Sequence, residues 1–461
     1  MHLFSPETYQ QRREQLRQQV GHGKIIFPGN GESSRNFRDN WYHFRQDSSF
    51  LYYFGLAQAD LVGVIDCDEG KDYLFGDDAG IDMVIWTGPL ESMASLGDRI
   101  GVDQSLPLSQ LPAQLQGKVH FLPPYRAGTT LQLAEWTNRS VPDIQSGSSM
   151  DLIKAIIPQR SVKSEAEIAE MHKAASLTSS MHLAVMRAAR PGLKEHELVG
   201  IANQLVWEHH GDFSFPPIMT INGQTLHNHH YHNTLQAGDL LLYDGGAESN
   251  SFYAGDMTRA YPVNATYSDR QKAIYEVVLA AHQASVKALA PGKRFLDIHL
   301  LAAQTITEGL QAVGLMKGDV VESVAAGAHS LFFQHGLGHM LGLDVHDMEN
   351  FGEVHVGYGE GMEKSTEFGL KSLRLGRELE AGFAVTIEPG IYFIPELIDT
   401  FRTEGKFTDF VNYDMLESFK DFGGIRIEDD YIIRPDGSEL LGTPLARTVS
   451  EVEAERQHAF S

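Results

Sequence analysis

Short apolar runs separated by turn-forming residues recur along the first third of the chain. They include KIIFPGN, LVGVIDCDEGKDYLFGDD and MVIWTGP. Apolar runs of about four to eight residues between Gly, Pro, Asn and Asp are typical of strands. The chain begins differently, because Ser5 and Pro6 suit the N-cap and first position of a helix with a basic polar face. We expect an α/β domain made of these strands and helices.

A long helical pattern follows a small polar segment. Residues 143–151, DIQSGSSMD, are the best candidate for an interdomain linker. Ser164 and Glu167 then have the spacing of a capping box, and the amphipathic pattern continues to Arg190, before a Pro-Gly pair. We expect two domains, residues 1–155 and 156–461.

Residues 240–263, LLLYDGGAESNSFYAGDMTRAYPV, have the pattern of a β-hairpin, with apolar stretches on both sides of a polar turn. Asp244 and Asp256 are equidistant from Asn250, so a turn centred there places the two carboxylates opposite each other on one face. Carboxylates that close repel unless a cation neutralises them, and a divalent metal would do so. The hairpin alone fits two solvent-exposed turn aspartates equally well.

Two further apolar strands contain charged residues. Glu388 interrupts FAVTIEPGIYFI and is followed by Pro-Gly, which breaks the strand. In GGIRIEDDYII, alternation places Arg426 and Glu428 on the same face. Buried charges are costly unless they are paired or bind a metal. Glu428 could therefore be a metal ligand, or could form a structural ion pair with Arg426.

The stretch HGLGHMLGLDVHD, residues 335–347, contains histidines with the spacing of a zinc-binding helix, His335 and His339. Three glycines interrupt it, and each costs up to about 1 kcal/mol inside a helix. No glutamate follows His335, so the HExxH zinc motif is absent. We expect a loop or short strand whose glycines let the backbone approach a site closely.

Composition narrows the function further. The hydrophobic and charged fractions of 42% and 21% are those of a soluble globular protein, and no apolar run approaches the length of a membrane span. A net charge of −24 argues against nucleic acid and anionic membranes as partners. It favours solubility, or a field that attracts cations. Cys67 is the single cysteine, and the N-terminus lacks the pattern of a secretory signal, so we expect a cytoplasmic protein.

Taken together, these residues resemble a known family. Five of them occur in the order and contexts of the metal ligands of the pita-bread metallopeptidases: Asp244, Asp256, His339, Glu388 and Glu428. HGLGHMLGLDVHD, TIEPGIYF and GIRIEDD are similar to the Xaa-Pro branch, aminopeptidase P and prolidase, and YHFRQDSSFLYYFGL resembles a motif of their N-terminal domain. The resemblance covers nearly the whole chain. It implies an α+β fold, with a C-terminal pita-bread domain and an α/β N-terminal domain.

The resemblance also implies a cofactor of two divalent ions. Asp256 and Glu428 would bridge them, Asp244 and Glu388 would each bind one, and His339 would be the one histidine ligand. A site with one nitrogen and many oxygen donors suits manganese, with cobalt, iron or zinc as alternatives. The hairpin departs from the family pattern, because it has one extra residue between its aspartates. We expect that residue in the turn, since YAGDMTR is intact around Asp256.

Further residues match positions that act on substrate in the family. Glu388 would take up and pass on the proton of the attacking water, His346 would contact the scissile carbonyl, and His335 would line the proline pocket. His227 and Arg374 would face the substrate, with Arg374 holding its terminal carboxylate, and Arg426 would orient Glu428. Without the resemblance, His335 and His346 would be interpreted as core histidines. Three other histidines are expected in a solvated loop: His229, His230 and His232.

The implied activity is hydrolysis of the bond between an N-terminal residue and proline. Xaa-Pro aminopeptidase, which accepts peptides of any length, is slightly favoured over Xaa-Pro dipeptidase. A non-catalytic binding module on the same fold is disfavoured, because all five ligands are present. The same ligands argue against a creatinase-like enzyme, the N-terminal domain argues against a methionine aminopeptidase, and the many carboxylates argue against a mononuclear iron oxygenase. The resemblance also implies a homo-oligomer.

Overall fold

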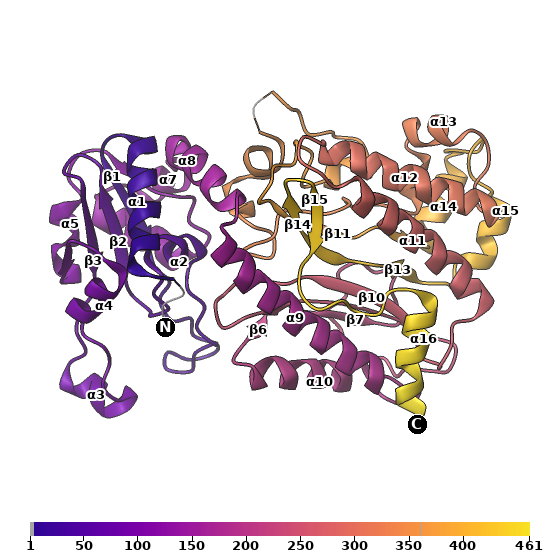
Figure 1. The fold of residues 1–461 in the computed structure, drawn as a ribbon, viewed down its shortest axis with the longest axis horizontal. Helices are drawn as coiled ribbons and strands as arrows, with labels where there is room; N and C mark the ends of the chain where they lie inside the picture. Colours follow the sequence, from indigo (N-terminus) through magenta and orange to yellow (C-terminus); the bar gives the residue numbers. More distant parts are fainter. Residues whose placement is uncertain (1–3, 360) are drawn as a thin grey trace. The chain divides into compact units, whose positions relative to one another are not determined.

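The computed structural model describes residues 4–359 and 361–461, which form two compact units. Unit 1 contains the described residues up to Arg160 together with Asn350–Gly352. Unit 2 contains Ser161–Glu349 and Glu353–Ser461. Helices and sheets occur in both units (Figure 1), which agrees with the expected α+β class. Among the described residues, no helix combines the length and apolar character needed to cross a bilayer.

Unit 1 is built on a mixed sheet with the strand order β4-β3-β2-β1-β5. Its strands are β1 (Lys24–Pro28), β2 (Val62–Asp66), β3 (Lys71–Phe75), β4 (Gln104–Leu106) and β5 (Val119–His120). Its helices are α1 (Pro6–Val20), α2 (Ser48–Phe54), α3 (Ile81–Thr87), α4 (Met93–Ile100), α5 (Leu111–Gln114), α6 (Ala127–Thr137), α7 (Val141–Ser146) and α8 (Met150–Ser161). The expected start of α1 is confirmed, with Ser5 at the N-cap and Pro6 as the first helical residue.

Two expectations for unit 1 are wrong. MVIWTGP is not a strand, because most of it belongs to α3, a helix without buried side chains that lies away from the sheet (Figure 1). The apolar run in this segment has the pattern of a strand, but the segment does not pair with any strand of the sheet. Residues 143–151 are not a linker either. They hold the end of α7 and the start of α8, and the Ser140–Asp143 capping box fixes the first of these helices.

Unit 2 combines long helices with several small sheets. The strand orders are β10-β8-β7, β11-β14-β15, β12-β13 and β6-β9. The strands are β6 (Asp212–Phe213), β7 (Ile218–Thr220), β8 (Leu240–Gly245), β9 (Ala247–Glu248), β10 (Met257–Pro262), β11 (Ala384–Ile387), β12 (Gly390–Tyr392), β13 (Gly424–Arg426), β14 (Asp429–Arg434) and β15 (Gly437–Leu440). The helices are α9 (Glu165–Ala188), α10 (Glu195–Glu208), α11 (Asp269–Ala288), α12 (Phe295–Ala312), α13 (Val320–Ala325), α14 (Pro395–Thr403), α15 (Tyr413–Leu416) and α16 (Val449–Gln457).

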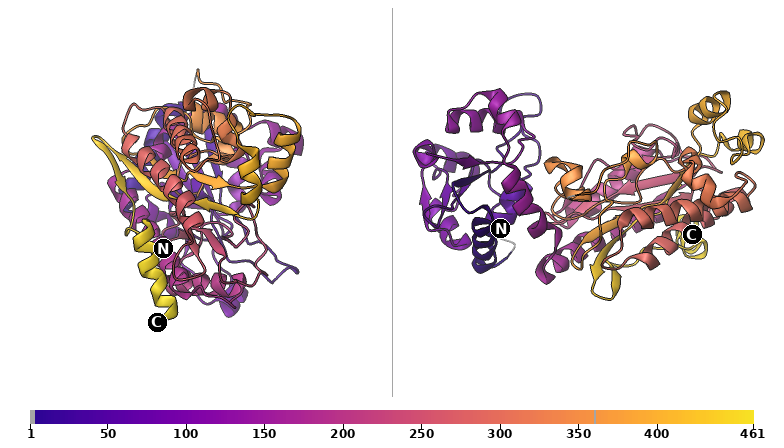
Figure 2. Two further views of the ribbon diagram at one scale, coloured as in Figure 1. Left: turned by 90° about the vertical axis from the view of Figure 1, so that its right-hand side faces the viewer. Right: turned by 90° about the horizontal axis from the view of Figure 1, so that it is seen from above.

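The helices of unit 2 cover these sheets, and α11 and α12 run alongside each other in contact (Figures 1 and 2). The capping box of α9 forms as expected, with Ser164 and Glu167 each bonded to the other's backbone. The helix ends at Ala188, two residues before the expected Arg190. The residue before a proline is pushed out of the helical region, which explains the earlier end before Pro191.

The hairpin of β8 and β10 forms, but its register differs from the expected one. Asp244 pairs with Thr258, so Asp256 lies two residues farther along the same face and not directly opposite. The same register continues past the strands, because Glu248 bridges Ala254 and the Ser249 amide donates to the Tyr253 carbonyl. This described stretch of the hairpin therefore contains no bulge between the paired strands and the turn. The placement of the extra residue in the turn stays a prediction.

Candidate metal centre

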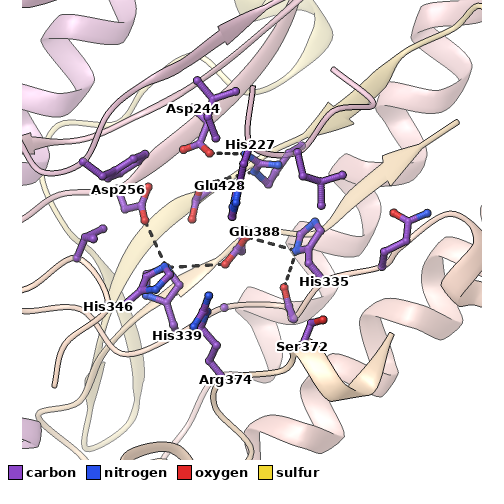
Figure 3. A pocket seen from close by; sticks show the side chains of 18 of the residues that line it. His227, Asp244, Asp256, His335, His339, His346, Ser372, Arg374, Glu388 and Glu428 are labelled. Atoms are coloured by element: carbon purple, nitrogen blue, oxygen red, sulfur yellow. Dashed lines mark hydrogen bonds and ion pairs between the residues drawn. The ribbon is translucent and has the colours of Figure 1, made fainter. Parts of the chain in front are cut away.

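A cavity of about 570 Å³ in unit 2 brings together all ten residues selected from the sequence. They are His227, Asp244, Asp256, His335, His339, His346, Arg374, Glu388, Arg426 and Glu428. Figure 3 labels all of them except Arg426, and the labelled side chains converge on one region from several loops and strands. An apolar wall completes the cavity, formed by Phe215, Pro216, Ile218 and Leu226.

Three buried side chains form the centre of this group. Asp256, His339 and Glu428 each offer a ligand atom, and these atoms all lie within 4.8 Å of one another. His339 Nε2 is 3.3 Å from Asp256 Oδ2. Asp256 immediately precedes β10, His339 lies in a loop, and Glu428 lies between β13 and β14. A β-bridge between Thr258 and Glu428 joins strand β10 to the segment between β13 and β14. It brings Asp256 and Glu428 together, although the two carboxylates are far apart in the sequence.

The loop that carries His339 runs along strand β11. Met340 bridges Val385, and the Thr386 amide donates to the His339 carbonyl. A Cβ on Gly338 would lie 2.0 Å from the Thr386 carbonyl oxygen, so only glycine fits this approach. The segment is not helical, and the expected close approach of its backbone is confirmed.

Glu388 lies at the break between β11 and β12, where Pro389 ends the first strand. Its Oε1 is 3.8 Å from His339 Nε2, and its Oε2 is 3.4 Å from His335 Nδ1. The Glu388 side chain is 18% exposed, which leaves it open to the cavity.

Asp244 and Arg426 form a buried ion pair at the edge of the centre. Arg426 was expected to orient Glu428, and its Nε lies 3.9 Å from that carboxylate, while its guanidinium also binds Asp244. Thr258 makes the closer contact with Glu428. Its hydroxyl donates to Glu428 Oε2 at 2.6 Å and accepts from Arg426 Nε at 2.9 Å. Thr258 was missed from the sequence, although it shares the Asp256 face two residues farther on.

The electrostatics of the centre favour a bound cation. Burial, followed by the carboxylates of Glu428 and Asp244, raises the pKa of Asp256 well above its usual range. Burial also raises the pKa of Glu428 well above its usual range and that of Glu388 to about 8. Burial lowers the pKa of His339, which keeps the imidazole neutral.

Asp256 Oδ1 is buried and has no hydrogen-bond partner in the described part of the chain. An orphaned carboxylate oxygen beside two other carboxylates and a neutral imidazole is costly by itself. Divalent metal ions are bound by this donor set, and their charge would remove the cost. The residues present therefore fit a metal centre.

Two acidic residues that the sequence interpretation missed support the ligands from behind. Asp430 Oδ2 accepts the backbone N–H of Asp256 at 2.9 Å. Asp429 Oδ1 accepts from Arg259 at 2.7 Å, and the same guanidinium donates to the Glu428 carbonyl at 2.8 Å. The pair of aspartates directly after Glu428 could have indicated these two residues, but the residues that they bind are far away in the sequence.

The other histidines differ in their partners. His335 Nε2 lies 2.9 Å from the Tyr392 hydroxyl, and burial lowers the pKa of His335 to about 3. The ring of His346 is centred 4.1 Å from that of His339, and His346 Nδ1 donates to Glu349 Oε2 at 2.5 Å. His227 reaches the same cavity from the histidine-rich loop. The other histidines of that loop are exposed as expected, although His229 also lines the cavity.

Arg374 extends into the cavity toward His339 and Glu388 (Figure 3). Its NH1 group binds both Glu349 and Glu353. Neither glutamate was selected from the sequence, because both lie in a polar segment with no recognisable pattern.

Comparisons with known proteins agree with this geometry. Residues 169–435 match the model of metallopeptidase family M24, and residues 9–121 match that of the aminopeptidase P N-terminal domain. An Xaa-Pro dipeptidase of Homo sapiens is 33% identical over 441 residues, which cover 93% of this chain and 88% of that protein. An Xaa-Pro aminopeptidase of Escherichia coli is 30% identical over 480 residues, which cover 98% of both chains.

Solved structures give the same result. The aminopeptidase PepP of Pseudomonas aeruginosa superposes with a TM-score of 0.82 at 29% identity and covers all of both chains. A zinc-substituted Escherichia coli aminopeptidase P in complex with product has a TM-score of 0.82 at 28% identity and covers 99% of both chains.

Proposed function

Because the chain belongs to metallopeptidase family M24, we propose that it removes the N-terminal residue from peptides with proline in second position. The convergence of Asp256, His339 and Glu428 in a buried cavity is the observation that carries this proposal. The similarity to Xaa-Pro peptidases over almost the whole chain supports the proline specificity. The residues that line the centre supply ligands, proton acceptors and an apolar wall.

We assign the metal ligands to Asp244, Asp256, His339, Glu388 and Glu428, which would hold two divalent ions. One nitrogen among many carboxylate oxygens makes a hard donor set, so manganese is the proposed occupant, with cobalt, iron or zinc as alternatives. When bound, such ions lower the pKa of a water and polarise a carbonyl. Asp244 is paired with Arg426 and would have to share its carboxylate with the metal.

The remaining residues would bind and orient the substrate. Glu388 lies at the cavity surface, where its carboxylate can accept the proton of the attacking water and pass it to the proline nitrogen. His346 is fixed through Nδ1 by Glu349, which leaves Nε2 to contact the scissile carbonyl oxygen. His335 and His227 would flank the proline, and the apolar wall would exclude water around it.

A dipeptidase activity is the second candidate. It is favoured by the 33% identity to the human Xaa-Pro dipeptidase and by the presence of Arg374 in the cavity. We favour the aminopeptidase, because Arg374 already binds two glutamates.

We further propose that the protein is a cytoplasmic homo-oligomer and that its domains span residues 1–155 and 156–461.

Metal removal tests the proposed activity. We expect the chelated enzyme to lose hydrolysis of Ala-Pro-Ala and to regain it when manganese is added. The His339→Ala variant should keep its far-ultraviolet circular dichroism and lose more than about 100-fold in metal affinity and in kcat/KM. Full turnover by chelated enzyme, or by His339→Ala, would contradict the metal assignment.

A further inference from the structure

The guanidinium of Arg374 is occupied by carboxylates of its own chain. Its NH1 group donates to Glu353 Oε1 at 2.9 Å and also binds Glu349. The side chains of Arg374, Glu353 and Glu349 are 33%, 25% and 39% exposed, so all three reach solvent. Arg374 lines the cavity, and the two glutamates line a small pocket beside it that Arg374 shares. A substrate group that approaches Arg374 therefore meets two anions at the same place.

The contacts continue on both sides as a chain of alternating charges. Glu353 also pairs with Lys364, and Glu349 accepts the hydrogen bond from His346 Nδ1. That hydrogen bond, together with the charges of His346 and Arg374, lowers the pKa of Glu349 against the opposing effect of burial, which keeps its carboxylate ionised. In the run Lys364, Glu353, Arg374 and Glu349, two cations therefore face two carboxylates.

The pairing of Arg374 with two carboxylates changes which substrate groups the cavity can bind. A free arginine selects a carboxylate strongly, because both oxygens can accept from its planar fork. The charge of an arginine that is already paired with two carboxylates is more than balanced by them, and an additional carboxylate is repelled by these partners. A neutral carbonyl is repelled much less and can accept one of the remaining N–H groups.

We propose that Glu349 and Glu353 neutralise Arg374 and thereby let the enzyme accept peptides in which proline carries no free carboxylate. This inference rests on the proposed function and names the residues that let it act on Xaa-Pro units followed by an amide bond. Glu353 is the residue that isolates the effect, because it contacts Arg374 and Lys364 but has no contact with the proposed catalytic histidine.

A pair of substrates of equal length tests the proposal. Ala-Pro and Ala-Pro-amide differ only in the charge on proline, so their ratio of kcat/KM measures the preference for a carboxylate. In the manganese-loaded enzyme we expect the amide to be cleaved at least as well as the acid. The Glu353→Gln variant should raise the acid-to-amide ratio about fivefold, the effect of one exposed ion pair.

Three variants complete the design. Glu353→Asp keeps the charge and should keep the wild-type ratio. Glu380→Gln removes a carboxylate from an Arg377 ion pair outside the cavity and should also leave the ratio unchanged. Glu349→Gln should shift the ratio in the same direction as Glu353→Gln. If Glu353→Gln does not fold, Glu349→Gln alone decides the outcome.

The possible failures are distinguishable. If the loaded enzyme cleaves none of Ala-Pro, Ala-Pro-amide and Ala-Pro-Ala, the proposed function itself is wrong. If it cleaves both but the ratio does not change in the glutamine variants, only the role of Glu349 and Glu353 is refuted. A wild-type preference for the acid of more than tenfold would also refute it, because Arg374 would then be free to bind the carboxylate.

Discussion

Thr258 shows how one small side chain can order a group of charges. Its hydroxyl is fully buried, donates to Glu428 and accepts from Arg426. A hydroxyl has only these few interactions to make, so both neighbours are held in one orientation. Residues that orient metal ligands in this way usually tune affinity without touching the ion.

Replacing Thr258 by Val should therefore weaken metal binding and leave the fold intact. Valine has nearly the same shape but cannot donate to Glu428, so we expect manganese affinity to fall about 10- to 100-fold, as measured by titration calorimetry. Thr258→Ser keeps the hydroxyl and should bind metal nearly as well as the wild type. Equal affinities of the Val variant and the wild type would show that the hydroxyl does not orient the ligand.

Residues with unusual surroundings in the sequence could be selected in advance, whereas their supporting partners could not. Glu388 and Glu428 stand out because each interrupts an apolar strand. Thr258 and Asp430 do not stand out, because their importance comes from bonds to residues about 170 positions away along the chain. Such pairings are determined by how separate strands meet.

At the scale of elements, the loop 335–347 depends on strand β11 for its shape. The Leu341 amide donates to the Ala384 carbonyl, and the Glu388 amide donates to the Leu337 carbonyl. Gly338 lies between these bonds with the strand backbone where a side chain would be. The loop and the strand therefore place His339 and Glu388 relative to each other.

The Gly338→Ala variant should disturb this arrangement. The added methyl group cannot avoid the Thr386 carbonyl, so the loop must move, and we expect a loss of about 1–3 kcal/mol in stability together with weaker metal binding. Thermal unfolding and manganese titration would measure both effects. Gly200→Ala is the matched control, because that helical position has open space and should tolerate alanine.

The β8–β10 hairpin shows which structural features the alternation of apolar and polar residues predicts and which it does not. The two strands and the shared face of the aspartates were predictable from alternation, but the register was not. The midpoint between Asp244 and Asp256 is Asn250, whereas the observed ladder is centred one residue later, at Ser251. The turn decides this position, and Phe252 adopts a left-handed conformation within it (φ 65°), which its residue type does not predict.

At the scale of the molecule, unit 2 contains neutral histidines in its interior. Burial lowers the pKa of His182 and His299 to about 3 and that of His329 to about 4. Neither ring nitrogen of His299 has a hydrogen-bond partner among the described residues. Protonation of these rings is therefore strongly disfavoured while the protein is folded.

These groups should make the protein sensitive to acid. The unfolded chain takes up protons on its histidines below about pH 6.5, whereas the folded chain does not, so stability is complete above that pH and is lost as the pH falls. Each of the three should reduce the unfolding free energy by up to about 1.4 kcal/mol per pH unit between pH 6 and 4. Urea unfolding at several pH values would measure the slope.

The His299→Leu variant provides the comparison for that slope. Leucine fills a similar volume beside Phe333 and cannot take up a proton, so the pH dependence should become less steep by about one proton. Identical slopes for the variant and the wild type would mean that His299 does not contribute.

The separation of the proposed ligands along the chain has a consequence for how the enzyme matures. Asp244 and Glu428 are far apart along the chain, and Asp256 meets Glu428 only after β10 and β13 have come together. A partly synthesised polypeptide that stops short of Glu428 lacks a complete cage. A divalent metal would thus be captured by a finished fold, and metal loading would be a late event in biosynthesis and not a nucleus for folding.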